Sequence, residues 1–179
     1  MLTKTVYLSL GSNLGDRATT LRTAVERLRE LGELRAVSAV YETEPVDFRD
    51  QPWFYNCAVE LTTTLMPMQL LARLQQIELD LGRQRLRPKG PRTLDVDILL
   101  FARAVVNAPP KLVIPHLGLH QRRFVLIPLV EIAPDLRHPV LRRTMRELLA
   151  ALPPSGQAVK RVGRLEELPG ASQAGDKAI

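Results

Sequence analysis

Residues 94–101 read LDVDILLF, and this stretch decides how the rest of the chain is interpreted. Acidic and apolar side chains alternate along it, which predicts a β-strand with its two aspartates on one face. The opposite face must be buried, so the strand is expected in a sheet that helices cover. The residues assigned to the two faces are Asp95 and Asp97 on the first, and Val96, Ile98 and Leu100 on the second.

The segments before residue 94 alternate between the periodicity of strands and that of helices. Strands are predicted at residues 5–10, 35–43 and 54–63. One helix is predicted between an N-cap at Asp16 and a stop at Gly32, and another between Pro67 and Gly82. The resulting order, β-α-β-β-α-β, predicts an α+β, ferredoxin-like core, an antiparallel sheet with helices on one face.

The pattern becomes less regular after residue 102. Short helices are predicted within residues 116–134 and at residues 144–152, as a C-terminal helical extension of the core. From residue 156 onward the chain is small and polar. The expected organisation is therefore a single catalytic domain over residues 1–155 and a polar tail over residues 156–179.

The composition favours a soluble protein with anionic partners. The 179 residues suffice for one domain, and no apolar run is long enough to span a bilayer. The N-terminus lacks the apolar core of a signal peptide, and the single cysteine, Cys57, cannot form an internal disulfide, so a cytoplasmic location is expected. The net charge of +6 and the pI of about 10.0 favour nucleic acid, anionic membranes or phosphorylated small molecules.

The acidic pair follows directly on a basic loop. Two carboxylates on one face repel each other unless a cation lies between them, and Mg²⁺ prefers carboxylate, phosphate and water oxygens. An isolated Asp-x-Asp is usually only the exposed side of a sheet, but here the preceding loop is rich in cations that suit phosphate. A magnesium and triphosphate site is therefore expected. The cations of the loop are Arg83, Arg85, Arg87, Lys89 and Arg92.

Two other segments resemble parts of a ligand site. Residues 11–15 read GSNLG between a predicted strand and a helix; a tight turn is the preferred interpretation and a phosphate cradle the alternative. Four of the eight aromatic residues fall within residues 48–55, where Asn56 follows at once. Aromatic faces and an amide suit a flat heterocycle.

The sequence resembles the family of 6-hydroxymethyl-7,8-dihydropterin pyrophosphokinases, enzymes of the folate pathway. The central motif is KGPRTLDVDILL at residues 89–100. The resemblance extends in order over residues 5–152 through LSLGSN, YETEP, QPWFYN, IELDLGR and IPH followed by R, F, PL and EIAP. The family often carries Trp where this chain has Lys89, and an aromatic residue where it has Leu117.

The resemblance implies transfer of pyrophosphate from ATP to the pterin's hydroxymethyl group, with release of AMP. It implies ATP as co-substrate and two Mg²⁺ ions, held by Asp95 and Asp97, with Arg83 and Arg92 completing the catalytic set. A monomer is expected. The residues it implies around ATP are Gln75, Glu78, Arg83, Arg85, Arg92, Ile98, Lys111, His116 and Arg122. Those it implies around the pterin are Thr43, Pro45, Val46, Phe54, Asn56 and Phe124.

Three alternatives belong to other classes. A basic domain of this topology is also the plan of an RNA-recognition module, but the exposed aromatic pattern of that fold is missing, so nucleic acid and membranes are not expected as partners. A metal-dependent nucleotidyl transferase or cyclase could share the acidic pair. His116 and His120 are four residues apart, as in some zinc sites, but no third ligand lies nearby.

Overall fold

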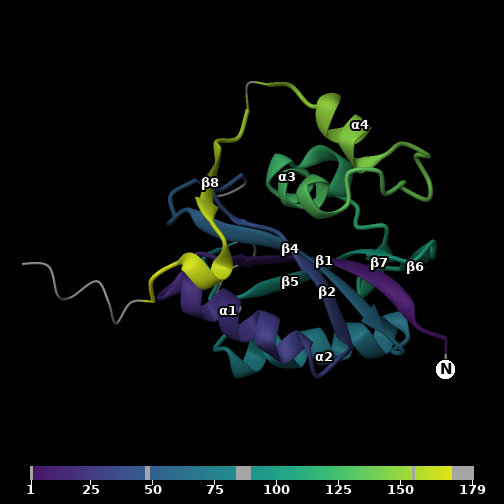
Figure 1. Ribbon diagram of the computed structural model, residues 1–179, viewed down its shortest axis with the longest axis horizontal. Helices are drawn as coiled ribbons and strands as arrows, with labels where there is room; N and C mark the ends of the chain where they lie inside the picture. The colour runs from purple at the N-terminus through teal and green to yellow at the C-terminus, as the bar shows by residue number, and fades with distance from the viewer. Residues whose placement is uncertain (1, 47–48, 84–89, 155, 171–179) are drawn as a thin grey trace, which may run out of the picture.

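The computed structural model describes residues 2–46, 49–83, 90–154 and 156–170, which form three layers around one sheet (Figure 1). Helices α1 (Arg17–Leu28) and α2 (Pro67–Asp80) cover one face of the sheet. Helices α3 (Arg123–Ile132) and α4 (Met145–Ala150) lie over the other face. No helix within these residues is long and apolar enough to cross a bilayer.

The sheet is antiparallel and has the strand order β5-β1-β4-β3-β8, with β2 paired to β4 beside β3. This order confirms the ferredoxin-like core. The strand predicted over residues 35–43 is two strands, because the ladder is interrupted at Ser38 and Ala39. The strands are β1 (Lys4–Ser12), β2 (Glu33–Val37), β3 (Val40–Thr43), β4 (Phe54–Thr63), β5 (Asp95–Phe101) and β8 (Val159–Gly163).

The two helices below the sheet begin where the sequence predicts. The carboxylate of Asp16 accepts a hydrogen bond from the backbone N–H of Thr19 at 3.0 Å, which satisfies a free donor of the first turn of α1. Pro67 opens α2, where its fixed φ suits the helix and its missing N–H is not needed. Gly82 follows α2 with φ +82°, a conformation that other residues rarely adopt.

Two apolar cores lie on opposite faces of the sheet, and β5 contributes to both. Val96 and Ile98 pack below the sheet against α1 and α2, as predicted. The register between β1 and β5 shifts by one residue after Ile98, so the strict alternation stops there. Leu99 and Leu100 consequently both pack above the sheet, with α3 and α4. The prediction that Leu100 shares a face with Val96 and Ile98 is wrong because of this bulge.

The predicted tail is also wrong for the described residues 156–170. Strand β8 pairs with β3 at the edge of the sheet, from Val40 opposite Gly163 to Thr43 opposite Val159. The short helix η2 (Leu165–Glu167) then packs on α1, with Leu165 buried in the lower core. The remaining short elements are β6 (Val106–Ala108), β7 (Leu112–Ile114) and η1 (Leu119–Gln121).

We expect the substitution Leu165→Ala to lower the free energy of unfolding by about 2–3 kcal/mol, because it removes a buried side chain and leaves a cavity. Leu165 is only 5% exposed. Urea unfolding followed by circular dichroism measures the change. Val162→Ala, at a 39% exposed position of β8, is the matched control and should change stability by less than about 0.5 kcal/mol. Equal effects of the two substitutions would mean that the C-terminal segment does not contribute to the core.

Candidate active site

A cavity of about 310 Å³ opens above the sheet, at the end where β5 begins. The register places Asp95 opposite Gly11 and Gly11 opposite Asn56, so one row of residues crosses the floor from β5 through β1 to β4. The cavity is lined by Ser9, Gly11, Thr43, Glu44, Pro45, Val46, Gln51, Phe54, Asn56, Arg83, Arg92, Asp95, Asp97, His116, Arg122, Phe124 and Gln157.

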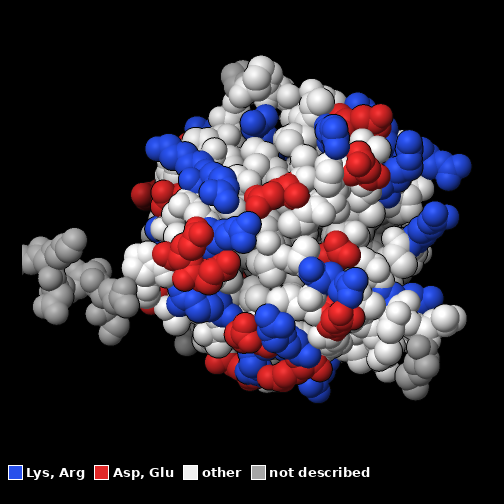
Figure 2. Space-filling view, viewed as in Figure 1, with Lys and Arg blue, Asp and Glu red and all other residues white. Residues whose placement is uncertain are grey.

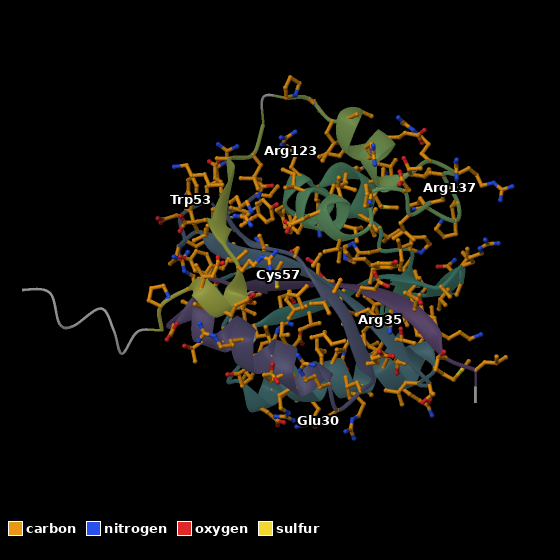
Figure 3. All side chains as sticks on the ribbon, viewed as in Figure 1. Glu30, Arg35, Trp53, Cys57, Arg123 and Arg137 are labelled. Carbon is orange, nitrogen blue, oxygen red and sulfur yellow. The ribbon has the colours of Figure 1, made fainter. Side chains whose placement is uncertain are left out.

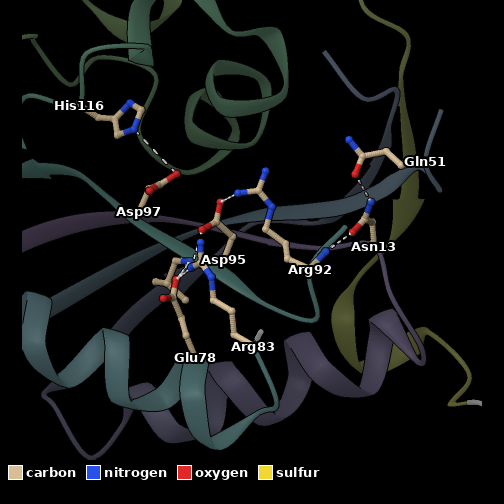
Figure 4. A network of polar contacts seen from close by, with 9 residues as sticks. Asn13, Gln51, Glu78, Arg83, Arg92, Asp95, Asp97 and His116 are labelled. Carbon is tan, nitrogen blue, oxygen red and sulfur yellow. Dashed lines mark hydrogen bonds and ion pairs between the residues drawn. The ribbon is translucent and has the colours of Figure 1, made fainter. Parts of the chain in front are cut away.

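The two aspartates have different partners although they share a face (Figure 4). Asp95 lies between two arginines, with Oδ1 2.7 Å from Arg83 and Oδ2 2.7 Å from Arg92. Asp97 has no such pair among the described residues; its Oδ2 lies 3.9 Å from Nε2 of His116. Asp95 is therefore already paired with guanidinium groups, whereas Asp97 faces the cavity without an ion pair to any arginine that the structure describes.

The surroundings of Asp97 and His116 shift the pKa values of both side chains. Loss of hydration at the cavity floor, reinforced by the neighbouring Asp95 carboxylate, raises the pKa of Asp97 to about 7. Burial, followed by the charge of Arg122, lowers the pKa of His116, so its imidazole is neutral near pH 7. Nδ1 of His116 accepts a hydrogen bond from Gly118 N–H at 3.1 Å, which assigns the proton to Nε2. His116 can thus donate toward Asp97 or toward a ligand oxygen.

Glu78 supports Arg83 from below. Its side chain is 6% exposed and forms an ion pair with Arg83, while its Oε1 accepts from the backbone N–H of Val96 at 2.7 Å. Burial raises the pKa of Glu78, and the Val96 N–H and the Arg83 charge oppose that shift. Glu78 is absent from the cavity lining, so the structure places it as a support that fixes Arg83 against β5.

The other half of the cavity is aromatic. Phe54 and Phe124 both line it, and the guanidinium carbons of Arg92 and Arg122 lie 5.5 Å and 5.8 Å from their respective ring centres. In the same half of the cavity, the buried amide of Asn56 donates to the hydroxyl of Thr43 at 2.5 Å. This half offers flat apolar faces and a polar edge, which suits a planar heterocycle.

Gly11 leaves the space that the side-chain amide of Asn56 occupies. A Cβ at Gly11 would lie 2.7 Å from Asn56 Oδ1, a distance that real Cβ atoms do not tolerate. The absence of a side chain in β1 is therefore what allows an amide to stand on the floor of the cavity. Sequence reasoning assigned Gly11 to a turn and missed this role.

In the turn at residues 12–15, Asn13 forms hydrogen bonds to two loops, one at Gln51 and Pro52 and the other at Arg92 (Figure 4). The amide nitrogen of Asn13 donates to Gln51 Oε1 at 3.0 Å and to Pro52 O at 2.9 Å. Its amide oxygen accepts from Arg92 N–H at 2.8 Å. Leu14 is exposed and Gly15 has φ +64°. These contacts favour the turn over the phosphate cradle, since the polar groups of Asn13 are used within the protein.

Most residues that the sequence nominated meet in this one cavity. Gln75 and Lys111 are exposed elsewhere, and Ile98 packs below the sheet. Arg85 lies outside the described residues, as do Lys89 and the aromatic Phe48. Trp53 does not line the cavity. The lining residues that the sequence did not nominate are Ser9, Gly11, Glu44, Gln51 and Gln157.

The surface charge is mixed rather than concentrated. On the face shown in Figure 2, basic and acidic side chains lie interspersed over the helices and the upper layer. Some charged surface side chains form ion pairs, as Arg27 does with Asp80 at 3.0 Å.

The single cysteine, Cys57, lies at the centre of the sheet (Figure 3), where burial raises the pKa of its thiol to about 12. Cys57 is therefore a packing residue of the core.

Comparison with known proteins identifies the relatives of this chain. The family model described as 7,8-dihydro-6-hydroxymethylpterin-pyrophosphokinase matches residues 7–134. The 2-amino-4-hydroxy-6-hydroxymethyldihydropteridine pyrophosphokinase of Pseudomonas aeruginosa is 45% identical over 168 residues, covering 93% of this chain and 98% of that protein. The enzyme of the same name from Bacillus subtilis is 49% identical over 128 residues, covering 70% and 76%.

Other relatives are much longer than this chain. The folic acid synthesis protein fol1 of Schizosaccharomyces pombe is 43% identical over 155 residues, but this chain covers only 21% of it. Among solved structures, a Plasmodium falciparum HPPK-DHPS superimposes with a TM-score of 0.69 at 20% identity, covering 83% of this chain and 44% of that one. At that identity the likeness concerns the fold.

Proposed function

The chain belongs to the 7,8-dihydro-6-hydroxymethylpterin-pyrophosphokinase family, and we propose that it transfers pyrophosphate from ATP to the hydroxymethyl oxygen of 6-hydroxymethyl-7,8-dihydropterin, releasing AMP. The observation that carries the proposal is that one cavity combines two kinds of lining. An acidic pair with two arginines lies in one half, and two aromatic rings with a buried amide lie in the other. These halves suit a triphosphate and a pterin placed side by side.

Two Mg²⁺ ions fit the acidic pair by the chemistry of its donors. Asp95 and Asp97 present hard carboxylate oxygens from neighbouring positions of one strand, and the ionised form of Asp97 needs a cation. Bound magnesium would neutralise phosphate charge and keep the transferred group in line with the attacking oxygen. Asp95 and Asp97 would hold the ions, and the arginines would be released to the phosphates.

The arginines are the groups that change partners in this proposal. Arg83 and Arg92 pair with Asp95 in the structure, at 2.7 Å each. When Asp95 binds a cation, the guanidinium groups can turn their planar forks to phosphate oxygens without leaving the cavity. They would then stabilise negative charge on AMP and on the moving group. His116, with its proton on Nε2, can donate to a phosphate oxygen as well.

The pterin is proposed to stack between Phe54 and Phe124, with its edge on Asn56 and on the backbone at Thr43 to Val46. No side chain within the described cavity is placed as an obvious base for the substrate hydroxyl. Catalysis would then rest on position and charge, and positioning can lower a barrier by about 7–11 kcal/mol. We also propose that the protein works as a monomer in the cytoplasm, on these small molecules rather than on nucleic acid.

Magnesium binding to the free protein should weaken as the pH falls through about 7. The pKa of Asp97 is raised to about 7, so below that pH a proton occupies the group that must be ionised to bind a metal. Affinity should fall roughly tenfold per pH unit below 7 and level off above it. Calorimetry in buffers of different ionisation enthalpy should detect proton release at pH 6.5 and little at pH 8.5. A pH-independent affinity would place the metal on other groups.

Gly11→Ala should weaken pterin binding by about tenfold or more while nucleotide affinity changes little. The added Cβ would meet Asn56 Oδ1 at 2.7 Å and displace the amide from its bond to Thr43, and a lost polar contact of this kind is worth roughly one such factor. Titration calorimetry with each ligand measures both affinities. Gly15→Ala, at a turn position with open space around its Cβ, controls for general backbone strain. A pterin affinity equal to that of wild type in Gly11→Ala would mean that Asn56 does not bind the edge of the pterin.

Calorimetry with a non-hydrolysable ATP analogue tests the proposal on the wild-type protein. We expect the analogue to bind only with Mg²⁺, and the pterin to bind the resulting complex at a one-to-one ratio. A protein that binds the analogue but never the pterin would favour the nucleotidyl transferase alternative. Retention of mixed RNA on a filter at physiological salt would favour the RNA-binding alternative.

A further inference from the structure

The C-terminal segment reaches the substrate cavity at one side chain, Gln157. This residue lines the cavity although it lies beyond residues 7–134, which the family model matches. Its amide nitrogen donates to the backbone oxygen of Glu44. The backbone of Ala158 adds two contacts to the same residue: its oxygen accepts from Glu44 N–H at 3.0 Å, and its N–H donates to Glu44 Oε2 at 3.4 Å. Glu44 is thus held from one side by residues 157 and 158.

These contacts continue the sheet beyond its last ladder pair. The pairing of β3 with β8 ends at Thr43 and Val159, and Glu44 is the first residue past it. Glu44 connects Thr43 to Pro45 and Val46, which line the cavity beside the Asn56 amide. A loop that is already fixed loses less conformational entropy when a ligand binds. The Gln157 bond therefore lies where it can preorganise this wall.

Open space lies beside this segment. A second cavity of about 230 Å³ lies behind it and is also lined by Val46 and Gln157. Arg123, the first residue of α3 (Figure 3), donates to Pro153 O at 3.3 Å and so links α3 to the chain that leads to β8. With open space on this side of residue 157, the hydrogen bonds to Glu44 connect the C-terminal segment to the wall of the substrate cavity.

We propose that Gln157 is a positioning residue for the pterin: it holds the backbone at residues 43–46 in the conformation that reads the edge of the heterocycle. This inference rests on the proposed function. Gln157 acts through Glu44 and not on the phosphates, so it should affect the binding of the pterin and not that of ATP. The arginines and aspartates at the other half of the cavity are supported by Glu78 and Asn13 instead.

The test replaces the amide without shortening the side chain. Gln157→Met should raise the KM for the pterin about 3- to 10-fold, the range that one lost hydrogen bond corresponds to. The kcat at saturating pterin and the affinity for an ATP analogue with Mg²⁺ should stay within about twofold of wild type. Gln157→Glu, which puts an acceptor against the Glu44 oxygen, should raise the pterin KM at least as much. Lys160→Met, at an exposed position of β8, is the matched control and should change none of these values.

An unchanged pterin KM in both Gln157 variants would overturn the inference. So would parallel losses of pterin and nucleotide affinity, because they would indicate a general effect on the fold. Thermal unfolding of each variant separates that case, since positioning alone leaves the midpoint close to that of wild type. Failure of the proposed function looks different: the wild-type protein itself would not bind the pterin.

Discussion

Asp97→Asn is expected to reduce turnover about 1,000-fold or more while leaving the protein folded. The carboxylate faces the cavity with no arginine ion pair among the described residues. Lost hydration and the Asp95 carboxylate raise its pKa more than the charges of Arg122 and Arg92 lower it. Loss of one metal ligand removes several kcal/mol of transition-state stabilisation, and each 1.36 kcal/mol corresponds to roughly tenfold in rate. Steady-state assays at saturating Mg²⁺, ATP and pterin measure the effect.

Stability separates this role from a structural one. The ionised Asp97 is disfavoured by lost hydration and by Asp95, so its removal should leave the unfolding midpoint at pH 8 unchanged or raise it. Asp135→Asn, on an aspartate whose side chain is 82% exposed, is the matched control for loss of one carboxylate. Turnover near wild type in Asp97→Asn would exclude this residue from the metal site.

Arg83→Met is expected to destabilise the protein by about 3–5 kcal/mol and to reduce turnover as well. Arg83 and Glu78 are 14% and 6% exposed, and removal of the arginine leaves a buried carboxylate without its cation. Breaking a buried ion pair by removing one partner has a cost in this range. Chemical unfolding at pH 7.5 measures the stability, and the activity assay is run at low temperature, where the variant is folded.

A second substitution distinguishes support from chemistry. In Arg83→Met/Glu78→Gln the amide at position 78 can still accept from Val96 N–H, so most of the lost stability should return. Activity should not return, because the guanidinium proposed to hold phosphate is still missing. Arg27→Met, which removes a surface ion pair with Asp80, should leave both stability and activity close to wild type. Recovery of activity in the double variant would make Arg83 purely structural.

Local patterns predicted the parts of the fold that depend on neighbours in the sequence. The period of two put Asp95 and Asp97 on one face, and the signals at Asp16 and Pro67 located the starts of α1 and α2. Leu100 was assigned to the wrong face because a bulge depends on register with β1. Register is a property of two strands that are distant in sequence, and neither strand shows it alone.

The same limit explains what was missed in the site and in the C-terminal segment. Strand β8 lacks an apolar pattern, and only pairing with the open edge of β3 makes it a strand. Gln157 and Gly11 acquire their roles through Glu44 and Asn56, which the fold brings to them. Glu78 lies in α2, and nothing in the sequence of this helix shows that its last turn contacts the first residues of β5.

Analysis of the reaction products distinguishes pyrophosphate transfer from the alternative reactions. The wild-type protein is incubated with Mg²⁺, ATP and 6-hydroxymethyl-7,8-dihydropterin, and phosphorus NMR follows each nucleotide and each new phosphate ester. We expect AMP and a pterin carrying a diphosphate, formed in equal amounts and only when both substrates and the metal are present. Formation of ADP with a pterin monophosphate, or release of free pyrophosphate with AMP bound to the acceptor, would contradict it.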